Sequence, residues 1–560
     1  MNEQVGHDPD AGRTPAWCEW RRGGSPLLLV APHGGRRPPI NAAAPPPQLR
    51  VNDLYTPELT RILMDRLDAT GIINAGQDRN TLDLNRTSQV RQRAPWWLAL
   101  LVREIEVILG RHGHAEVVFV HGWNTGQPQC DIGVGAVERG GEVRPTGGAQ
   151  LTILPNYLRQ RIGAFRAACA QRMITTSIGE KYPGSHRNNL LQLFTERAIA
   201  PADPVARRLG RWAAEQRLNA CQLELGIPLR WPGVWRDRFL DAAAEGFGWS
   251  RRPGSGRRLL RAERTRARRD SVRGSRVAAL QFYDPAADAG MLASLGRAGP
   301  QVIGARLLLF LGGQRVALFT GEEPDVPGQR VLPLRFTSQD DVLRMDFTAP
   351  MLLIEDAAVC LDLEAALHAA RVVEAEVHLR VACGQRKRPA PALAFGTVDG
   401  ELTVAGRRWR VHAGGFLTGS ALRATGPRQQ VMLAANFAAA GAVLSRVVGG
   451  ESHSLGLHFT ADAVRSLDGM RIEIATDGDA YTPATFALLS DGQPPLSGQA
   501  LSRMSILRPA GRGGYVRVTF GVARFCWRSE RGSGLYEYAR PVLEPGGAYA
   551  RRGSSAVKLP

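Results

Sequence analysis

Two histidines follow short apolar runs and are themselves followed by glycine. His33 comes soon after the run at residues 26–31, and His121 directly after the run at residues 117–120. This pattern predicts two buried strands that present an imidazole at their carboxyl ends, where glycine lets a ligand approach the backbone. A single histidine at a strand end is usually a hydrogen-bonded structural residue, but two such ends are hard to explain by packing. We therefore hypothesise that His33 and His121 are ligands of one metal ion.

A metal-dependent hydrolase needs a third protein ligand, usually a histidine or a carboxylate, and an open position for water. Asp53 is the favoured candidate, because it lies between His33 and a predicted helix. Glu58, in the first turn of that helix, is the alternative. Asp53 could also simply cap the segment that follows it. The choice between the two carboxylates stays open at this point.

Three further residues could supply the rest of a hydrolytic site. Glu224 would be the base that takes a proton from water. Arg86, with Asn85 beside it, would bind a substrate carboxylate, because guanidinium is planar and always charged. Each has a plainer alternative: Glu224 stands within an alternating apolar run and could face solvent, and Asn85 and Arg86 could belong to a surface salt bridge.

Strands and helices alternate through the first half of the chain. We expect strands at 27–30, 72–75, 117–120 and 219–225, and helices at 56–68, 95–109, 157–170, 204–216 and 235–246. This order is typical of an α/β layer with a largely parallel sheet, whose ligand site lies beyond the carboxyl ends of the strands. In the helix at 95–109, Glu104 and Glu106 are expected near the exposed side.

The chain is strongly basic, with a formal net charge of +19 and an isoelectric point of about 10.5. Such a charge usually suggests nucleic acid as a partner. The basic residues are almost all arginine, however, since lysine occurs only at Lys181, Lys387 and Lys558. Together with abundant alanine, glycine and proline, this composition indicates a GC-rich bacterial genome. Nucleic acid is therefore not expected as a partner.

The seven cysteines include no Cys-x-x-Cys pair, which favours a reducing compartment over a disulfide framework. The first residues are polar and contain no signal-peptide core. No apolar run approaches the roughly 18 residues that a membrane span needs. The expectation is a soluble cytoplasmic protein without a membrane span.

Residues 251–276 hold eleven arginines, and we interpret them as a solvated linker rather than a tether for nucleic acid or membrane. The part before them, 1–250, is the expected α/β domain. After them come many short strand-like runs with turn signals, which predict an all-β half. Two β-barrels or sandwiches are expected there, at 277–390 and 391–545, with a tail at 546–560.

Motifs of the first half resemble the N-formylglutamate amidohydrolase family over about residues 20–250. In order, they are Pro32-His33-Gly34-Gly35, Asp53-x-x-Thr56-x-x-Leu59, Asp83-Leu84-Asn85-Arg86, His121-Gly122 and Gln222-Leu223-Glu224-Leu225. The resemblance implies a three-layer domain with a mixed sheet, similar to the zinc carboxypeptidases. It also implies zinc-dependent hydrolysis of an amide bond in an N-formyl or N-acyl amino acid. The family usually has serine where this chain has Gly34, so a related N-acyl amino acid or a γ-glutamyl amide would suit the same chemistry.

The β half resembles the carotenoid-hydratase-like, double lipocalin-type proteins. The residues concerned are Leu467-Asp468-Gly469-Met470, the run at 515–521, and Gly534-Leu535-Tyr536-Glu537-Tyr538. This resemblance implies paired barrels that could hold an apolar ligand lined by Tyr536, Glu537 and Tyr538. The plainer alternative is that these aromatic residues close a barrel and pack. As an alternative function, the β half would bind or hydrate a lipid-like or isoprenoid molecule, and the α/β domain would be non-catalytic.

Overall fold

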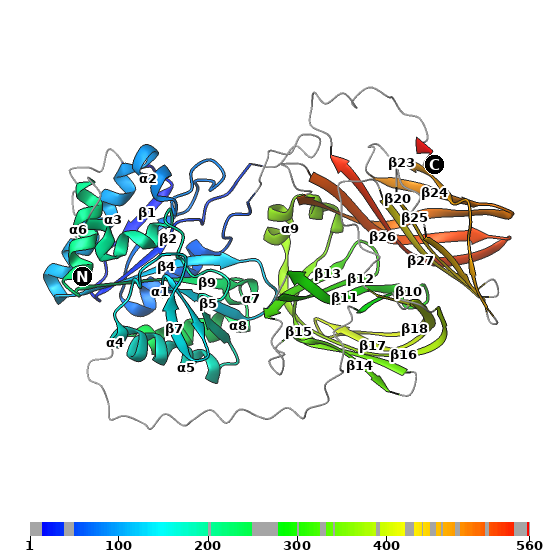
Figure 1. Ribbon diagram of the computed structural model, residues 1–560, viewed down its shortest axis with the longest axis horizontal. Coiled ribbons are helices and arrows are strands. Elements are labelled where there is room, and N and C mark those ends of the chain that lie inside the picture. The colour runs from blue at the N-terminus through cyan, green and yellow to red at the C-terminus, as the bar shows by residue number, and fades with distance from the viewer. Residues whose placement is uncertain are drawn as a thin grey trace. The chain divides into compact units, whose positions relative to one another are not determined.

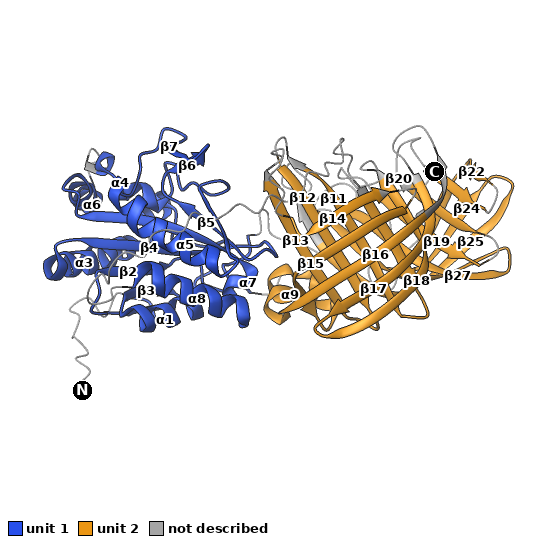
Figure 2. Cartoon of the chain, turned by 90° about the horizontal axis from the view of Figure 1, so that it is seen from below, with its two compact units in different colours: residues 1–38, 50–264 blue, residues 39–49, 265–560 orange. Residues whose placement is uncertain are grey.

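The chain forms two compact units (Figure 2). Unit 1 comprises Met1–Pro38 and Arg50–Arg264, and unit 2 comprises Pro39–Leu49 and Thr265–Pro560. The computed structural model describes residues 14–38, 50–199, 203–248, 278–299, 302–324, 332–339, 342–387, 393–419, 430–438, 441–448, 455–460, 463–476, 482–509, 515–542 and 557–558. The arginine-rich segment at 251–276 lies outside these residues, as does most of the expected tail at 546–560.

Unit 1 is built around a seven-stranded mixed sheet (Figure 1) with the strand order β1-β3-β2-β4-β9-β5-β8. The neighbours β3, β2, β4 and β9 are parallel, whereas β1 and β5 run antiparallel to β3 and β9. All four expected strands and the α/β class are confirmed. The strands are β1 (Cys18–Arg21), β2 (Leu27–Ala31), β3 (Thr70–Asn74), β4 (Ala115–Trp123), β5 (Gln129–Gly133), β8 (Thr175–Ile178) and β9 (Leu218–Gly226), with a separate hairpin of β6 (Ala136–Arg139) and β7 (Glu142–Pro145).

Helices cover both faces of this sheet. Because side chains alternate along a strand, Leu27 and Leu29 of β2 pack with α1, α5 and α8, and Leu28 and Val30 pack with α3 and α6 on the opposite face. Two apolar cores on the two sides of one sheet make a three-layer domain. The helices are α1 (Thr56–Leu67), α2 (Thr87–Arg93), α3 (Pro95–His112), α4 (Pro155–Tyr157), η1 (Leu158–Ile162), α5 (Gly163–Gln171), η2 (Leu190–Phe194), η3 (Glu196–Ile199), α6 (Pro204–Ala214), α7 (Ile227–Arg230) and α8 (Val234–Phe247).

One expectation for helix α3 is wrong. Glu104 is fully buried rather than near the exposed side. Its carboxylate accepts hydrogen bonds from Arg22 Nε at 2.7 Å and from Arg103 Nε at 3.0 Å. The two guanidinium groups make its burial possible, because they replace the water that a carboxylate needs. Glu106, in contrast, is exposed as expected.

Unit 2 begins with a closed barrel. Its nine-stranded sheet has the order β13-β12-β11-β10-β18-β17-β16-β15-β14, and a further pairing of β13 with β15 closes eight of the strands into a barrel. The strands are β10 (Ala278–Asp284), β11 (Ala289–Gly299), β12 (Val302–Leu311), β13 (Val316–Pro324), β14 (Leu334–Gln339), β15 (Val342–Ile354), β16 (Arg371–Lys387), β17 (Leu393–Val404) and β18 (Arg407–Gly419), with η4 (Ala357–Leu361) and α9 (Leu363–Ala369) before β16. The expected boundary between residues 390 and 391 falls between β16 and β17, which pair with each other. The first barrel therefore extends to Gly419.

The second sheet of unit 2 has ten strands in the order β22-β21-β20-β19-β27-β26-β25-β24-β23-β28. Within the described parts of the chain its two outermost strands do not pair, so it is a half-barrel, where the sequence predicted a second barrel or sandwich. The strands are β19 (Gln430–Phe437), β20 (Ala442–Val448), β21 (Leu455–Phe459), β22 (Val464–Ser466), β23 (Arg471–Thr476), β24 (Pro483–Ser490), β25 (Gln493–Pro509), β26 (Tyr515–Trp527), β27 (Glu530–Val542) and β28 (Val557–Lys558).

Buried apolar side chains occupy the interior of the closed barrel, among them Leu307, Phe347 and Leu402. An eight-stranded barrel is just wide enough to be filled in this way. In the half-barrel, Tyr536 and Tyr538 belong to a buried apolar cluster, which is the packing role considered for them. The apolar ligand of the β half stays a prediction. Among the helices that the structure describes, none is both long and apolar enough to cross a membrane.

Candidate metal centre

His33 and His121 lie at the carboxyl ends of neighbouring strands. Strands β2 and β4 are parallel, with Val30 opposite Phe119, so that His33, just after β2, comes close to His121 near the end of β4. The two imidazole rings meet edge to face, with their centroids 4.8 Å apart. Asp53 lies in the segment before α1, and its backbone N–H donates to the carbonyl of His33 at 2.8 Å. The α/β fold thus brings three separate segments to one point.

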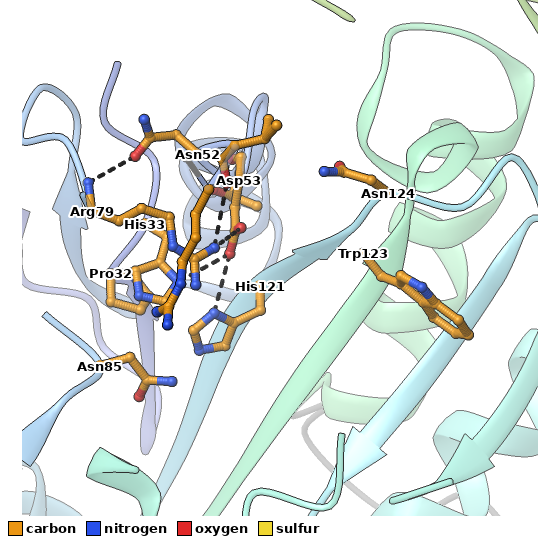
Figure 3. A network of polar contacts seen from close by, with 12 residues as sticks. Pro32, His33, Asn52, Asp53, Arg79, Asn85, His121, Trp123 and Asn124 are labelled. Carbon is orange, nitrogen blue, oxygen red and sulfur yellow. Dashed lines mark hydrogen bonds and ion pairs between the residues drawn. The ribbon is translucent and has the colours of Figure 1, made fainter. Parts of the chain in front are cut away.

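The carboxylate of Asp53 joins the two histidines (Figure 3). Its Oδ2 atom lies 3.3 Å from Nδ1 of His33 and 3.2 Å from Nδ1 of His121. All three side chains are buried, and each offers a ligand atom within 4.8 Å of the others. Among the described residues this is the only group of histidine, cysteine and acidic side chains with that spacing.

A second carboxylate contacts the other nitrogen of His33. Nε2 of His33 lies 2.7 Å from Oδ1 of Asp83. A neutral imidazole has one N–H and can donate to only one of the two carboxylates. If the shorter contact to Asp83 takes the proton, Nδ1 turns a lone pair toward Asp53 Oδ2, as two ligands of one cation do. An imidazolium would also satisfy both contacts, and metal analysis separates the two cases.

Two of the three distances between the ligand atoms fit a zinc ion. Ligand atoms of a tetrahedral zinc, each about 2.0–2.1 Å from the ion, lie about 3.3 Å from one another. The Asp53 oxygen lies 3.3 Å and 3.2 Å from the two Nδ1 atoms. Nε2 of His121 is buried and has no hydrogen-bond partner among the described residues, so His121 has no competing contact that would turn it away. His33, Asp53 and His121 therefore suit a divalent metal.

Charge around the site keeps two of these groups in the form that binds metal. Burial acts to raise the pKa of Asp53, but the charge of Arg79 and the hydrogen bonds with His121 and His33 outweigh it, so the pKa lies well below its usual value. Burial lowers the pKa of His121, although the hydrogen bond with Asp53 opposes this. At neutral pH the site thus holds an ionised carboxylate and a neutral imidazole, which are ligand forms.

Arginine side chains hold both carboxylates. Nη1 of Arg79 donates to Asp53 Oδ1 at 2.8 Å, which leaves Oδ2 to the histidines. Nη1 of Arg50 donates to Asp83 Oδ2 at 3.1 Å. The pKa of Asp83 also lies well below its usual value, because the contact with His33 and the charge of Arg79 outweigh the effect of burial. Both carboxylates are therefore oriented and ionised.

Glu224 lies on strand β9, beside His33, Asp53 and His121, which are together called the metal group. It is the register partner of His121 in the parallel pair β4–β9, so both side chains project from the same face of the sheet. Nε2 of Gln222 donates to Glu224 Oε1 at 3.3 Å. Burial raises the pKa of Glu224 well above its usual value, and the charges of Asp53 and Asp131 add to this effect. A raised pKa suits a carboxylate that exchanges protons near neutral pH.

Asn85 and Arg86 come from the same loop as Asp83. The backbone N–H of Asn85 donates to Asp83 Oδ1 at 3.0 Å, and Figure 3 shows Asn85 near the rings of His33 and His121. Nε of Arg86 lies 3.5 Å from Asp83 Oδ2, and its side chain is one-third exposed. Arg86 also forms an isolated β-bridge with Asn189. Both residues thus border the metal group, and Arg86 is reachable from solvent.

Asp53 and Glu58, the two candidates for the third ligand, differ in their distance from the histidines. Asp53 contacts both histidines, whereas Glu58 is half-buried in the first turn of α1 and is not part of the group. Sequence reasoning did not single out Asp83, Arg79 or the buried Arg230. For Asp83 a signal was present, since it opens the motif that contains Asn85 and Arg86.

No family model matches this chain, and no curated protein matches it. Several solved structures show distant similarity, including the following two. One is kievitone hydratase from Nectria haematococca, with 13% identity and a TM-score of 0.32, covering 48% of this chain and 89% of that chain. The other is N-formylglutamate amidohydrolase from Ralstonia eutropha, with 13% identity and a TM-score of 0.28, covering 42% of this chain and 96% of that chain. Neither comparison assigns a function to this chain.

Proposed function

We propose that unit 1 is a metal-dependent amidohydrolase that cleaves the amide bond of an N-formyl or N-acyl amino acid similar to N-formylglutamate. Zinc would be held by His33, Asp53 and His121. The observation that carries this proposal is that both histidines contact the same oxygen of the buried Asp53, at 3.3 and 3.2 Å.

Each neighbouring residue has a chemical role in this proposal. When bound, zinc would polarise the amide carbonyl and lower the pKa of a water molecule. Glu224, which projects from the same face as His121, would accept the proton of the attacking water and pass it to the leaving amine. Asp83 holds the ring of His33 through Nε2.

Arg86 and Asn85 would bind the carboxylate of the substrate. The guanidinium of Arg86 contacts Asp83 over a long distance of 3.5 Å, so it keeps donors for a second carboxylate. A substrate with an α-carboxylate would place its amide bond near the metal while its carboxylate lies on Arg86. This binding mode favours N-acyl amino acids over neutral amides.

Metal analysis and a hydrolysis screen of the full-length chain test the proposal. We expect about one zinc per chain, release of amino acid from N-formyl-L-glutamate or a related N-acyl amino acid, and loss of this activity with a chelator. His121→Ala should lose both metal and activity. His114→Ala is the matched control, because His114 is half-buried just before β4 and lies outside the group of His33, Asp53 and His121. A chain without stoichiometric metal whose His33→Ala/His121→Ala variant is still active would refute the proposal.

A further inference from the structure

The buried guanidinium group of Arg230 is bonded to the backbone segments that carry the metal group and Glu224. Arg230 ends the one-turn helix α7, which follows β9 directly, and its side chain is fully buried. Four oxygen atoms accept its hydrogen bonds, and all four are neutral. Nε donates to the carbonyl of Leu225 at 3.0 Å, Nη1 to that of Leu54 at 2.8 Å, and Nη2 to the carbonyl of Trp123 and to Asn124 Oδ1, both at 3.2 Å. A buried charge without an ion pair in this set calls for an explanation.

The acceptors follow the proposed site residues in the chain. Leu54 comes directly after Asp53, and Leu225 directly after Glu224. Trp123 comes two residues after His121. One planar group is thus bonded to the three backbone segments that carry a metal ligand, a second metal ligand and the proposed base.

The glycine at position 122 leaves room for the guanidinium group of Arg230. A Cβ atom at Gly122 would lie 2.3 Å from Nη1 of Arg230 and 3.0 Å from the Cβ of Asp53. Any side chain at Gly122 would therefore displace the guanidinium or the Asp53 segment. This close approach explains the glycine that follows His121.

Arginine suits this position better than lysine. Guanidinium offers five N–H donors in one rigid plane, and here they reach acceptors on three different segments. An ammonium group has three donors on a flexible stem and cannot reproduce the same spread. The ring of Trp231 lies 5.0 Å from the guanidinium carbon and adds a further contact.

We infer that Arg230 is a positioning residue that fixes Asp53, His121 and Glu224 relative to one another through its bonds to Leu54, Trp123 and Leu225. The inference rests on the proposed function, because it takes Asp53 and His121 as metal ligands. None of the four hydrogen bonds of Arg230 goes to the metal group itself. Its role is to keep the ends of the segments at a spacing that one metal ion can bridge.

Cobalt binding by the full-length chain tests this inference. Co²⁺ serves as the probe, because its visible absorption reports the coordination geometry. We expect Arg230→Lys to bind Co²⁺ at least about tenfold more weakly than the wild type, with an altered spectrum. Arg217→Lys is the matched control: Arg217 also donates to a backbone carbonyl, that of Gly113 at 3.0 Å, but is partly exposed. It should bind Co²⁺ like the wild type.

Gly122→Ala provides a second test that retains the arginine. The added methyl group would push against Nη1 and Asp53, so this variant should also bind Co²⁺ at least about tenfold more weakly. If Arg230→Lys does not fold, the Co²⁺ affinity of Gly122→Ala decides whether Arg230 has this role. Wild-type affinity and spectrum in the folded variant would overturn the role of Arg230 and leave the proposed function intact. A wild-type chain that binds no Co²⁺ would instead overturn the proposed function, and the inference with it.

Discussion

The proposed metal site predicts that Asp83 orients the ligand His33 without binding the metal itself, and this role can be measured. Its Oδ1 lies 2.7 Å from Nε2 of His33, so Asp83→Ala removes the acceptor that sets the orientation of the imidazole. We expect the zinc affinity to fall about 10- to 100-fold, as is usual for such outer carboxylates. Competition with a chromophoric chelator measures the change. Asp65→Ala is the control, since Asp65 is exposed and pairs with Arg21; equal affinities in the two variants would contradict the role of Asp83.

Glu224 should be needed for hydrolysis but not for metal binding. Glu224→Gln keeps the size of the side chain and removes the ability to accept a proton. We expect the rate of hydrolysis to fall about 10²- to 10⁴-fold while the zinc content stays unchanged, because loss of a general base has an effect of this size. Parallel measurements of activity and metal content on the same preparation check this. A variant that loses zinc would show instead that Glu224 is a ligand.

Sequence reasoning reached both histidines because two His-Gly strand ends repeat a pattern. It could not choose between Asp53 and Glu58, since both stand close to the start of one helix, and only the contact with the two Nδ1 atoms separates them. Gly34 is explained only by three-dimensional contacts. A Cβ atom there would lie 2.2 Å from Cγ of Pro57 and 2.6 Å from the carbonyl of Asn74, so serine has no room.

At the scale of elements, helix α3 offers a comparison of two glutamates. Glu104 is buried between two guanidinium groups, whereas Glu106 is 58% exposed and pairs with Arg208 at 3.4 Å. Glu104→Ala should lower the free energy of unfolding by about 2–3 kcal/mol, because it removes hydrogen bonds to charged groups. Glu106→Ala should change it by less than about 0.5 kcal/mol. Guanidinium unfolding of the full-length variants measures both, and equal losses would contradict the burial of Glu104.

Glu116 is the second residue of strand β4, and its titration should affect stability. Burial raises the pKa of Glu116, although Arg161 and the hydroxyl of Tyr157 oppose this. Between the usual and the raised pKa, the folded chain holds a proton that the unfolded chain has lost, so stability falls as the pH rises through this range. Glu116→Gln cannot titrate there. Its free energy of unfolding should therefore increase relative to the wild type as the pH rises above the usual pKa of glutamate, about 4.3. A difference that does not vary with pH would contradict the shift.

Helices and strands with regularly spaced apolar residues were predictable from the sequence, and more polar ones were not. Strands β2 and β4 are buried runs of apolar residues, and α3 has a clear apolar face. Strands β5 (QCDIG) and β8 (TTSI) and helix α2 (TSQVRQR) carry few apolar residues, so their pairing and packing follow from the fold around them. The spacing of apolar residues reveals a buried face only where the element itself has enough apolar residues to form one.

At the scale of the whole molecule, the sequence predicted that the second half is all-β. It did not predict which of its sheets closes into a barrel. The first barrel closes because β13 pairs with β15 past the intervening β14, a contact between strands that no local pattern announces. Sequence reasoning placed a domain boundary between residues 390 and 391, where a second set of strand-like runs begins. In fact this point lies between two neighbouring strands of one sheet.

The proposed metal site in unit 1 predicts how a cut chain behaves. Residues 251–276 hold eleven arginines between the last helix of unit 1 and the first strand of unit 2, so brief trypsin treatment should cut there first. Since His33, Asp53 and His121 all belong to unit 1, the zinc should remain with the N-terminal fragment. Mass spectrometry of the fragments, followed by separation and metal analysis, measures both outcomes, with uncut chain taken through the same separation as the control. Zinc in the C-terminal fragment would place the metal outside the group around Asp53. Its loss from both fragments, with retention in the uncut chain, would show that unit 1 alone does not hold it.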